Sequence, residues 1–205
     1  MKTQTKELQD KLTPQAAYDI LVEGNKRFVE NVKSQRNLQD QVSATSQGQY
    51  PFAVILSCID SRVPAELVFD QGIGDVFSVR VAGNVVNEDV LGSMEYACKV
   101  AGSKVLVVMG HTKCGAVNAA CNNVELGNIT PLLEKIKPAV NTIKAKCDEM
   151  TADAIEDVAI QNVKDSIELI KKESPILREM EEAGEIKIVG ASYSVASGEV
   201  EFLSL

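Results

Sequence analysis

Apolar runs alternate with amphipathic segments along most of this chain. The runs at 52–57, 76–81 and 104–110 predict strands, because parallel strands covered on both faces read as nearly continuous hydrophobic stretches. Apolar residues at helical spacing predict helices between and after these strands, at 64–69, 87–101, 114–124, 129–146, 151–173 and 174–183. Two further runs, 186–195 and 199–203, are joined at Ser197-Gly198 and predict a terminal hairpin.

Strands that alternate with helices predict an α/β fold, with a mostly parallel central sheet flanked by helices. The terminal hairpin adds an antiparallel C-terminal edge to this sheet. Ahead of the first strand, Thr13-Pro14 is typical of a helix start, and the helix should run to about Asn31. The polar segment 34–49 has no period and predicts a loop or extended arm. We expect residues 1–205 to form one domain, in which the helix and arm within 1–49 have no obvious place in a compact monomer.

The charge balance excludes several classes of partner. Lysine and arginine number 21 and aspartate and glutamate 29, so the net charge is −8, and such a chain repels nucleic acid and anionic membranes. No apolar stretch reaches the roughly 18 residues of a membrane span. No signal peptide is visible, although a processed mature form would look the same. Five cysteines, an odd number, indicate a reducing compartment and a cytoplasmic protein.

Two short segments carry the residues that point to chemistry. The only histidine, His111, precedes Cys114 by three residues, and Cys58 precedes Asp60 by two. Each segment follows a predicted strand, so both should emerge at the carboxyl edge of one sheet, where open α/β sheets place their sites. Two thiolates, one imidazole and an optional carboxylate are ligands that Zn²⁺ accepts in tetrahedral geometry. These residues therefore predict a zinc site.

The same segments resemble those of the β-class carbonic anhydrases. The resemblance rests on Cys58-Ile59-Asp60-Ser61-Arg62, on Val79-Arg80-Val81-Ala82-Gly83-Asn84 and on His111-Thr112-Lys113-Cys114, in that order. It implies an enzyme that holds one Zn²⁺ per chain through Cys58, His111 and Cys114. The implied reaction is the reversible hydration of carbon dioxide to bicarbonate and a proton by metal-bound hydroxide.

Asp60 and Arg62 take the catalytic roles that this resemblance implies. In the open, plant-like subtype, Asp60 orients the zinc-bound nucleophile and Arg62 restrains Asp60. In the closed, bicarbonate-regulated subtype, the aspartate is the fourth zinc ligand and a tryptophan lies three residues before the first ligand cysteine. Ile55 occupies that position here and the chain contains no tryptophan, although Arg80, which the closed subtype also uses, is present. The resemblance therefore favours the open subtype, with Asp60 as a ligand only in a closed state.

Three further residues resemble the substrate-pocket wall of the open subtype, namely Gln49, Phe77 and Tyr96. In the family, such residues line the carbon dioxide pocket across a dimer interface. The resemblance thus implies a homodimer or a dimer of dimers. In this assembly residues 1–49 pack on the partner subunit, and Gln49 reaches the neighbouring zinc pocket.

Two alternatives remain open. A related zinc hydrolase acting on CS₂ or COS would share the metal site and differ in the shape of its channel. A non-catalytic protein with a closed structural zinc would also keep the ligands. Elsewhere, the charge-rich segment 153–173 is interpreted as a solvated helix face, and Cys98 and Cys121 as packed core residues.

Overall fold

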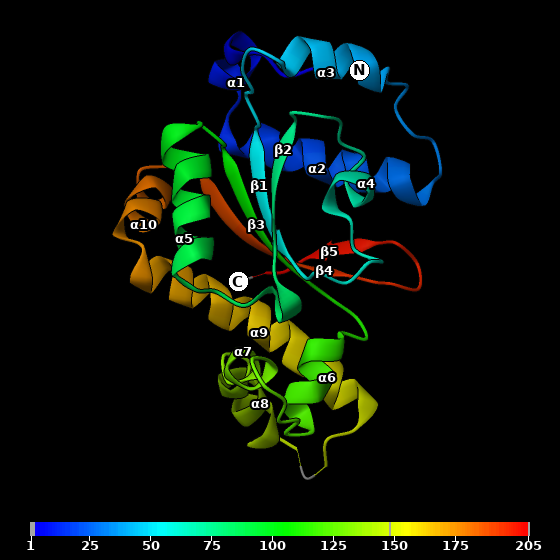
Figure 1. Cartoon of the computed structure of the whole chain (residues 1–205), viewed down its shortest axis with the longest axis vertical. Coiled ribbons are helices and arrows are strands. Elements are labelled where there is room, and N and C mark those ends of the chain that lie inside the picture. Colours follow the sequence, from blue (N-terminus) through cyan, green and yellow to red (C-terminus); the bar gives the residue numbers. More distant parts are fainter. Residues whose placement is uncertain (1–2, 148, 205) are drawn as a thin grey trace.

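A five-stranded sheet forms the centre of the molecule (Figure 1). The computed structural model describes residues 3–147 and 149–204 of the chain. The strand order is β2-β1-β3-β4-β5, in which the first four strands are parallel and β5 is antiparallel to β4. The strands are β1 (Ala53–Ser57), β2 (Val76–Arg80), β3 (Val105–His111), β4 (Lys187–Tyr193) and β5 (Val200–Phe202). The predicted α/β class, the mostly parallel sheet and the antiparallel C-terminal edge are confirmed.

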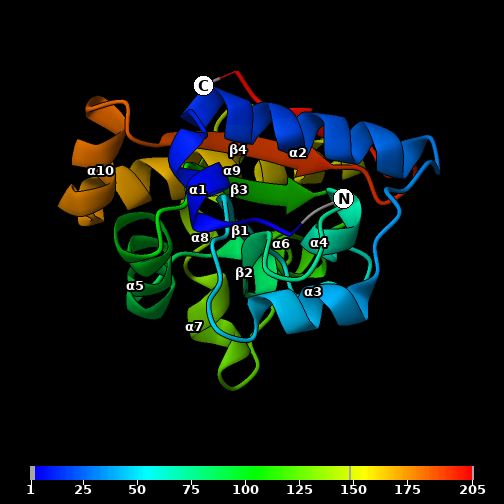
Figure 2. The ribbon, with the colours of Figure 1, turned by 90° about the horizontal axis from the view of Figure 1, so that it is seen from above.

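Helices cover both faces of this sheet (Figure 2). They are α1 (Lys6–Lys11), α2 (Pro14–Val29), α3 (Leu38–Thr45), α4 (Ala65–Val68), α5 (Glu88–Glu95), α6 (Gly115–Cys121), α7 (Ile129–Leu133), α8 (Lys137–Lys144), α9 (Ala152–Glu173) and α10 (Pro175–Glu182). A single 3-10 turn at Ala82–Asn84 and a π-helical turn at Tyr96–Val100 complete the described elements. Within the described residues, no helix combines the length and the apolar character that crossing a bilayer requires.

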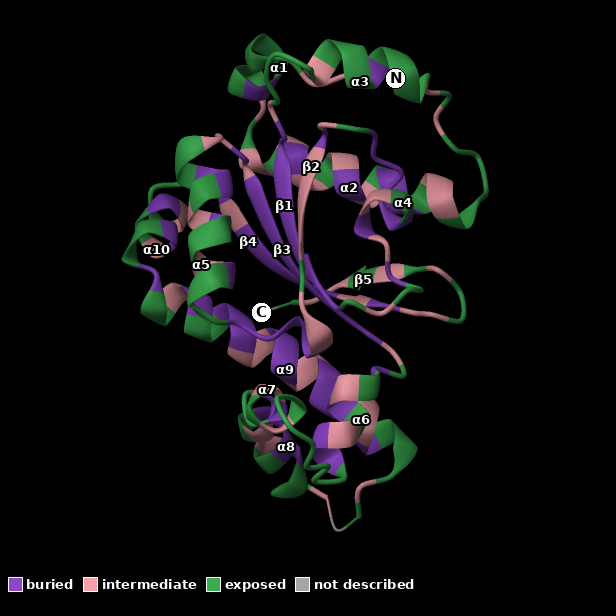
Figure 3. Cartoon of the chain, viewed as in Figure 1, coloured by how far each residue is buried: buried purple, intermediate pink, exposed green. Residues whose placement is uncertain are grey.

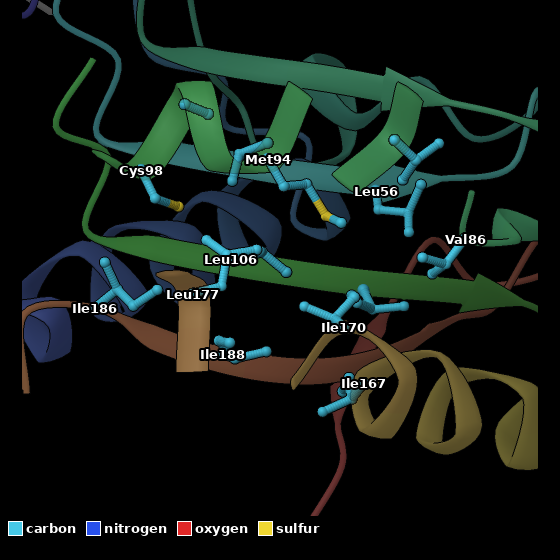
Figure 4. Close-up of a cluster of buried hydrophobic side chains, with 14 of the residues drawn as sticks. Leu56, Val86, Met94, Cys98, Leu106, Ile167, Ile170, Leu177, Ile186 and Ile188 are labelled. Atoms are coloured by element: carbon cyan, nitrogen blue, oxygen red, sulfur yellow. The ribbon is translucent and has the colours of Figure 1, made fainter. Parts of the chain in front are cut away.

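Separate apolar layers pack on the two faces of the sheet. One face carries Leu56 and Leu106 and is covered by α5, α9 and α10 (Figure 4). The other face carries Ile55 and Val107 and is covered by α2 and α4. Successive strand residues point to opposite faces, so β1 and β3 are buried along their whole length (Figure 3). The apolar runs that predicted these strands therefore reflect a sheet with two covered faces.

A third apolar cluster lies beyond the carboxyl ends of the strands. There α6 and α8 pack against α9, and α7 packs against α6 (Figure 1). Cys58 and Cys114 belong to this cluster and are almost completely buried. The two cysteines of the predicted zinc site therefore lie in an apolar environment.

The N-terminal region contains two helices that hydrophobic periodicity does not predict. Thr5 and Asn37 are the N-caps of α1 and α3, and their side chains accept hydrogen bonds from backbone amides of the first turn. The buried positions of these helices are polar: the Gln9 amide donates to the Pro51 carbonyl at 2.8 Å, and Gln41 accepts from a backbone amide at 3.2 Å. The prediction of a loop or extended arm was therefore wrong where α3 forms, because glutamines replace the apolar stripe that would have marked a helix.

Helix α2 packs on the sheet of its own chain. It buries Ala17 and Leu21 against the face that α4 also covers. Gly24 lies so close to the end of α4 that a Cβ atom would be 1.9 Å from the carbonyl oxygen of Phe69, so only glycine fits there. The helix therefore has a place within the monomer, which the sequence did not reveal. Packing of residues 1–49 on a partner subunit stays a prediction.

The predicted helix at 129–146 divides into α7 and α8. Pro138 lies in the first turn of α8, where the missing amide of proline costs no hydrogen bond. This proline therefore stands at the start of a second helix and does not kink a single one.

Candidate metal centre

The two predicted ligand segments meet at the carboxyl edge of the sheet. Cys58 follows β1, His111 ends β3, and Cys114 is the N-cap residue of α6. Strands β1 and β3 are parallel neighbours, so their carboxyl ends lie side by side. The ligand atoms of the two cysteines and the histidine all lie within 4.8 Å of one another, and the three residues are buried. The structure thus brings together the three residues predicted to bind metal.

The His111 ring is oriented for a ligand. Its Nδ1 atom donates to the backbone carbonyl of Thr112 at 2.9 Å, and in the neutral ring this bond leaves the lone pair of Nε2 available to a metal. This Nε2 atom is buried and has no hydrogen-bond partner among the described residues. A buried polar atom without a partner is costly, and a metal ion between His111 and the two sulfurs would satisfy it. The donor set and this unpartnered atom therefore fit a zinc ion.

The two thiols lie close enough to shift each other's pKa. A hydrogen bond with Cys114 lowers the pKa of Cys58 to about 4 against the opposing effect of burial, and His111 and backbone amides add to the lowering. One of these amides is that of Gly83, which donates to Cys58 Sγ at 3.3 Å. The same shared bond, together with burial, raises the pKa of Cys114. The lowered pKa of Cys58 favours its thiolate, which is the form that binds metal.

Asp60 and Arg62 form a forked ion pair beside these ligands. Arg62 Nε donates to Asp60 Oδ1 at 2.9 Å and Arg62 Nη2 donates to Oδ2 at 2.8 Å. These bonds outweigh a small effect of burial and hold the pKa of Asp60 well below its usual range. Asp60 Oδ2 lies 4.0 Å from His111 Nε2. The carboxylate is therefore ionised, held by the arginine, and next to the position where a metal would bind.

Arg80 fixes the backbone that carries Cys58 and Asp60. From the end of β2, its Nε donates to the Cys58 carbonyl at 3.1 Å and its Nη2 donates to the Asp60 carbonyl at 2.6 Å. Sequence analysis considered Arg80 only as part of a regulatory site. Its position directly opposite Ser57 in the sheet register explains the contact. The sequence does not reveal which residues of two neighbouring strands lie opposite each other, so this contact could not be predicted.

The predicted pocket residues fall into two groups. The rings of Phe77 and Tyr96 meet edge to face, with centroids 6.3 Å apart. They line a groove of about 760 Å³ between β2 and α5, to which Arg80 also contributes. Gln49 is exposed and lies ahead of β1, outside this groove. The structure brings two of the three residues together within one chain.

Helix α9 contacts the centre through two side chains that sequence analysis did not single out. Both carboxylate oxygens of Glu156 accept from the amide of Lys113, at 3.0 and 3.2 Å. Asn162 Nδ2 donates to the Gly83 carbonyl at 2.9 Å. The interpretation of 153–173 as a solvated face was therefore wrong at Glu156. No local signal distinguishes this glutamate from its exposed neighbours.

These features define an α/β protein with a buried cysteine–histidine–cysteine metal site at the carboxyl edge of a parallel sheet. The sequence model of the carbonic anhydrase family matches residues 53–200. The chain is 37% identical over 192 residues to carbonic anhydrase 2 of Mycobacterium tuberculosis, with 90% of each chain covered. It is 36% identical over 198 residues to the carbonic anhydrase of Mycolicibacterium smegmatis, with 93% and 94% covered.

The fold is also that of a solved relative. The β-carbonic anhydrase CafA of Aspergillus fumigatus superposes with a TM-score of 0.74 at 28% identity, covering 91% of this chain and 90% of that one. The chain belongs to the β-carbonic anhydrase family.

Proposed function

We propose that this protein is a zinc-dependent carbonic anhydrase that converts carbon dioxide and water reversibly to bicarbonate and a proton. Family membership supports this reaction, and one structural observation supports it for this chain in particular. The unpartnered His111 Nε2 converges with the sulfurs of Cys58 and Cys114 in a buried site. The proposed ligands are these three residues, with one Zn²⁺ per chain.

The zinc ion would supply the Lewis acidity that makes water nucleophilic near neutral pH. The chain's own contribution is to orient that water. The ionised Asp60 carboxylate can accept its proton in a hydrogen bond and so direct the oxygen lone pair toward carbon dioxide. Arg62 holds the carboxylate through two bonds and keeps it from rotating.

We propose the open subtype for the site. Both oxygens of Asp60 are bonded to Arg62, and an aspartate held in this way is restrained from serving as a fourth metal ligand. Arg80, which the closed subtype uses for bicarbonate, is engaged with two backbone carbonyls. These contacts support a fourth position left to water, which distinguishes a catalytic zinc from a structural one.

A dimer, or a dimer of dimers, would complete the substrate pocket. Gln49 precedes β1 and Cys58 follows it. A strand of this length separates them by roughly 17 Å at about 3.3 Å per residue, so Gln49 cannot line the pocket of its own subunit. The edge strand β2, with the Phe77–Tyr96 groove beside it, offers a surface for a partner whose Gln49 reaches the site. All five cysteines are free, which suits a reducing compartment such as the cytoplasm.

The decisive experiment is stopped-flow measurement of carbon dioxide hydration by the zinc-loaded protein, together with its metal content. We expect about one zinc per chain and a rate that Asp60→Asn abolishes while zinc is retained. A zinc-loaded protein without hydration activity would support the structural-zinc alternative. A protein that turns over CS₂ or COS much faster than carbon dioxide would support the hydrolase alternative.

A further inference from the structure

The peptide that links two proposed ligands has a restrained backbone. Lys113 lies between His111 and Cys114 and has a φ angle of 54°, in the left-handed region that side chains disfavour. Its own side chain is exposed and does not hold this conformation. Contacts from elsewhere in the fold must therefore stabilise the turn.

Glu156 provides such a contact. Its two carboxylate oxygens both receive the Lys113 amide, so the glutamate fixes the turn from the side of α9. On the other side of the same residue, Arg62 Nη2 donates to the Lys113 carbonyl at 3.3 Å. The turn between the ligands is thus held between the residue that orients Asp60 and a helix that carries no ligand.

Asn162 provides an equivalent contact on the side of Cys58, through the backbone of Gly83. Gly83 also has a left-handed backbone, with a φ angle of 64°, and its amide donates to Cys58 Sγ at 3.3 Å. The carbonyl of the same glycine accepts from the buried Asn162 amide at 2.9 Å. Asn162 therefore fixes the donor that points at the first thiolate.

The position of α9 relative to the ligands is itself tightly defined. Gly110 precedes His111, and a Cβ atom there would lie 2.8 Å from Val163 Cγ2 and 3.4 Å from the carbonyl oxygen of Ala159. The helix therefore packs directly on the backbone of the strand that ends in the histidine ligand. Because this contact leaves little room for movement, side chains on α9 can set the positions of groups around the centre.

We propose that Glu156 and Asn162 are positioning residues that hold the two cysteine ligands in metal-binding geometry through the backbones of Lys113 and Gly83. This inference rests on the proposed zinc site and identifies the residues that hold its ligands in place. Residues that orient metal ligands from outside typically change metal affinity or activity by 10- to 100-fold when they are removed. We expect a loss in this range, roughly 10- to 100-fold in metal affinity, for Glu156→Ala and for Asn162→Ala.

The test compares cobalt-substituted proteins. The visible absorption of bound Co²⁺ and its sulfur-to-metal band report the coordination geometry, and competition with a chelator reports affinity. Glu156→Ala should alter the spectrum and weaken binding, and Glu156→Gln should largely restore both because its amide oxygen can still accept the Lys113 amide. Asp157→Ala removes an exposed carboxylate from the same helix and should match the wild type.

Each result bears on the proposal. The proposal would be overturned if Glu156→Ala bound cobalt as Asp157→Ala does. It would also be overturned if Glu156→Gln were as defective as Glu156→Ala, because the loss of metal affinity would then not come from a lost hydrogen bond. Gln161→Ala serves as the control for Asn162→Ala, and circular dichroism checks that each variant folds. If Asn162→Ala does not fold, the Glu156 series decides alone. A wild-type protein that takes up neither cobalt nor zinc would overturn the proposed function as well, and this outcome is distinct from the others.

Discussion

Two aspartate–arginine clusters in this molecule form the same kind of ion pair but differ in how far they are buried. Asp60 and Arg62 are two residues apart, and the arginine side chain is 49% exposed. Asp70 instead binds Arg36 and Arg27, which lie 34 and 43 residues away, and its side chain is only 3% exposed. The first cluster orients a carboxylate beside the metal centre. The second joins the N-terminal region to the segment after α4.

Two arginines bind the carboxylate of the buried cluster, whereas among the described residues Arg62 alone binds that of Asp60. Asp70 accepts from Arg27 Nε at 2.6 Å, from Arg36 Nη1 at 2.5 Å and from the Ser34 amide at 3.2 Å. Arg36 Nη2 also donates to the Asp70 carbonyl. Burial raises the pKa of Asp70, but the bonds from Arg36 and Arg27 outweigh it and lower the pKa to about 2. An exposed pair contributes little stability, whereas removing one partner of a buried pair is costly.

The comparison implies that changes at the metal centre act on function and changes at Asp70 act on stability. The strongest test at the centre is Cys58→Ser, which replaces a thiolate by a poor zinc ligand. We expect loss of tight zinc binding and of carbon dioxide hydration, measured by metal analysis and stopped flow. Cys147→Ser changes a half-buried cysteine outside the centre and should retain both. Full zinc content in the Cys58 variant would contradict the ligand assignment.

Asp70→Asn should lower the free energy of unfolding by about 3 kcal/mol, the lower end of the range for a broken buried pair because Arg27 is partly exposed. Urea unfolding measures the loss. Activity per folded molecule should stay close to that of the wild type, since Asp70 lies outside the centre. A large fall in activity with unchanged stability would show that the two clusters are coupled, and the contrast between them would then fail.

The pH dependence of unfolding sharpens the same contrast. Since the pKa of Asp70 is lowered on folding, its contribution is complete above its unfolded pKa of about 4 and is lost as pH falls through about 2. We expect wild-type stability to decline in this window by on the order of 2 kcal/mol more than that of Asp70→Asn. Parallel curves for the two proteins between pH 4 and 2 would show that Asp70 carries no such linkage.

Arg62→Ala gives the smallest energetic effect and tests the exposed pair. Without the arginine, Asp60 loses its orientation, and hydration should slow by more than tenfold, about 1.4 kcal/mol of barrier. The free energy of unfolding should change little because the pair is exposed. Arg178→Ala removes a partly exposed arginine, far along the chain on α10, and should affect neither quantity. An unchanged rate in Arg62→Ala would remove the pair from the mechanism.

Local patterns predicted most of the sheet and the ligands. The apolar runs of β1 and β3 are buried on both faces, and each ends beside a candidate ligand segment. Hydrophobicity and spacing therefore located the segments, and the family resemblance singled out Cys58, His111 and Cys114 within them. The resemblance also implied that Arg62 holds Asp60, and the two residues are close enough in the chain for the fork to form locally.

Other features depend on contacts between residues that are distant in the sequence. Helices α1 and α3 were missed because their buried positions are glutamines, whose value lies in specific hydrogen bonds and not in apolar periodicity. Glu156 was assigned to a solvated face although it binds a backbone amide 43 residues away.

The sequence by itself therefore determined the strands, the order of the helices after them and the candidate ligand segments, since each of these is encoded over a few neighbouring residues. Only the tertiary structure decided which side chains support the ligands. Arg80, Glu156 and Asn162 act through backbone groups of residues that are distant in sequence. Almost any residue can offer a backbone amide or carbonyl, so the sequence does not reveal which backbone group a side chain will bind. These side chains and backbone groups come together only in the folded chain.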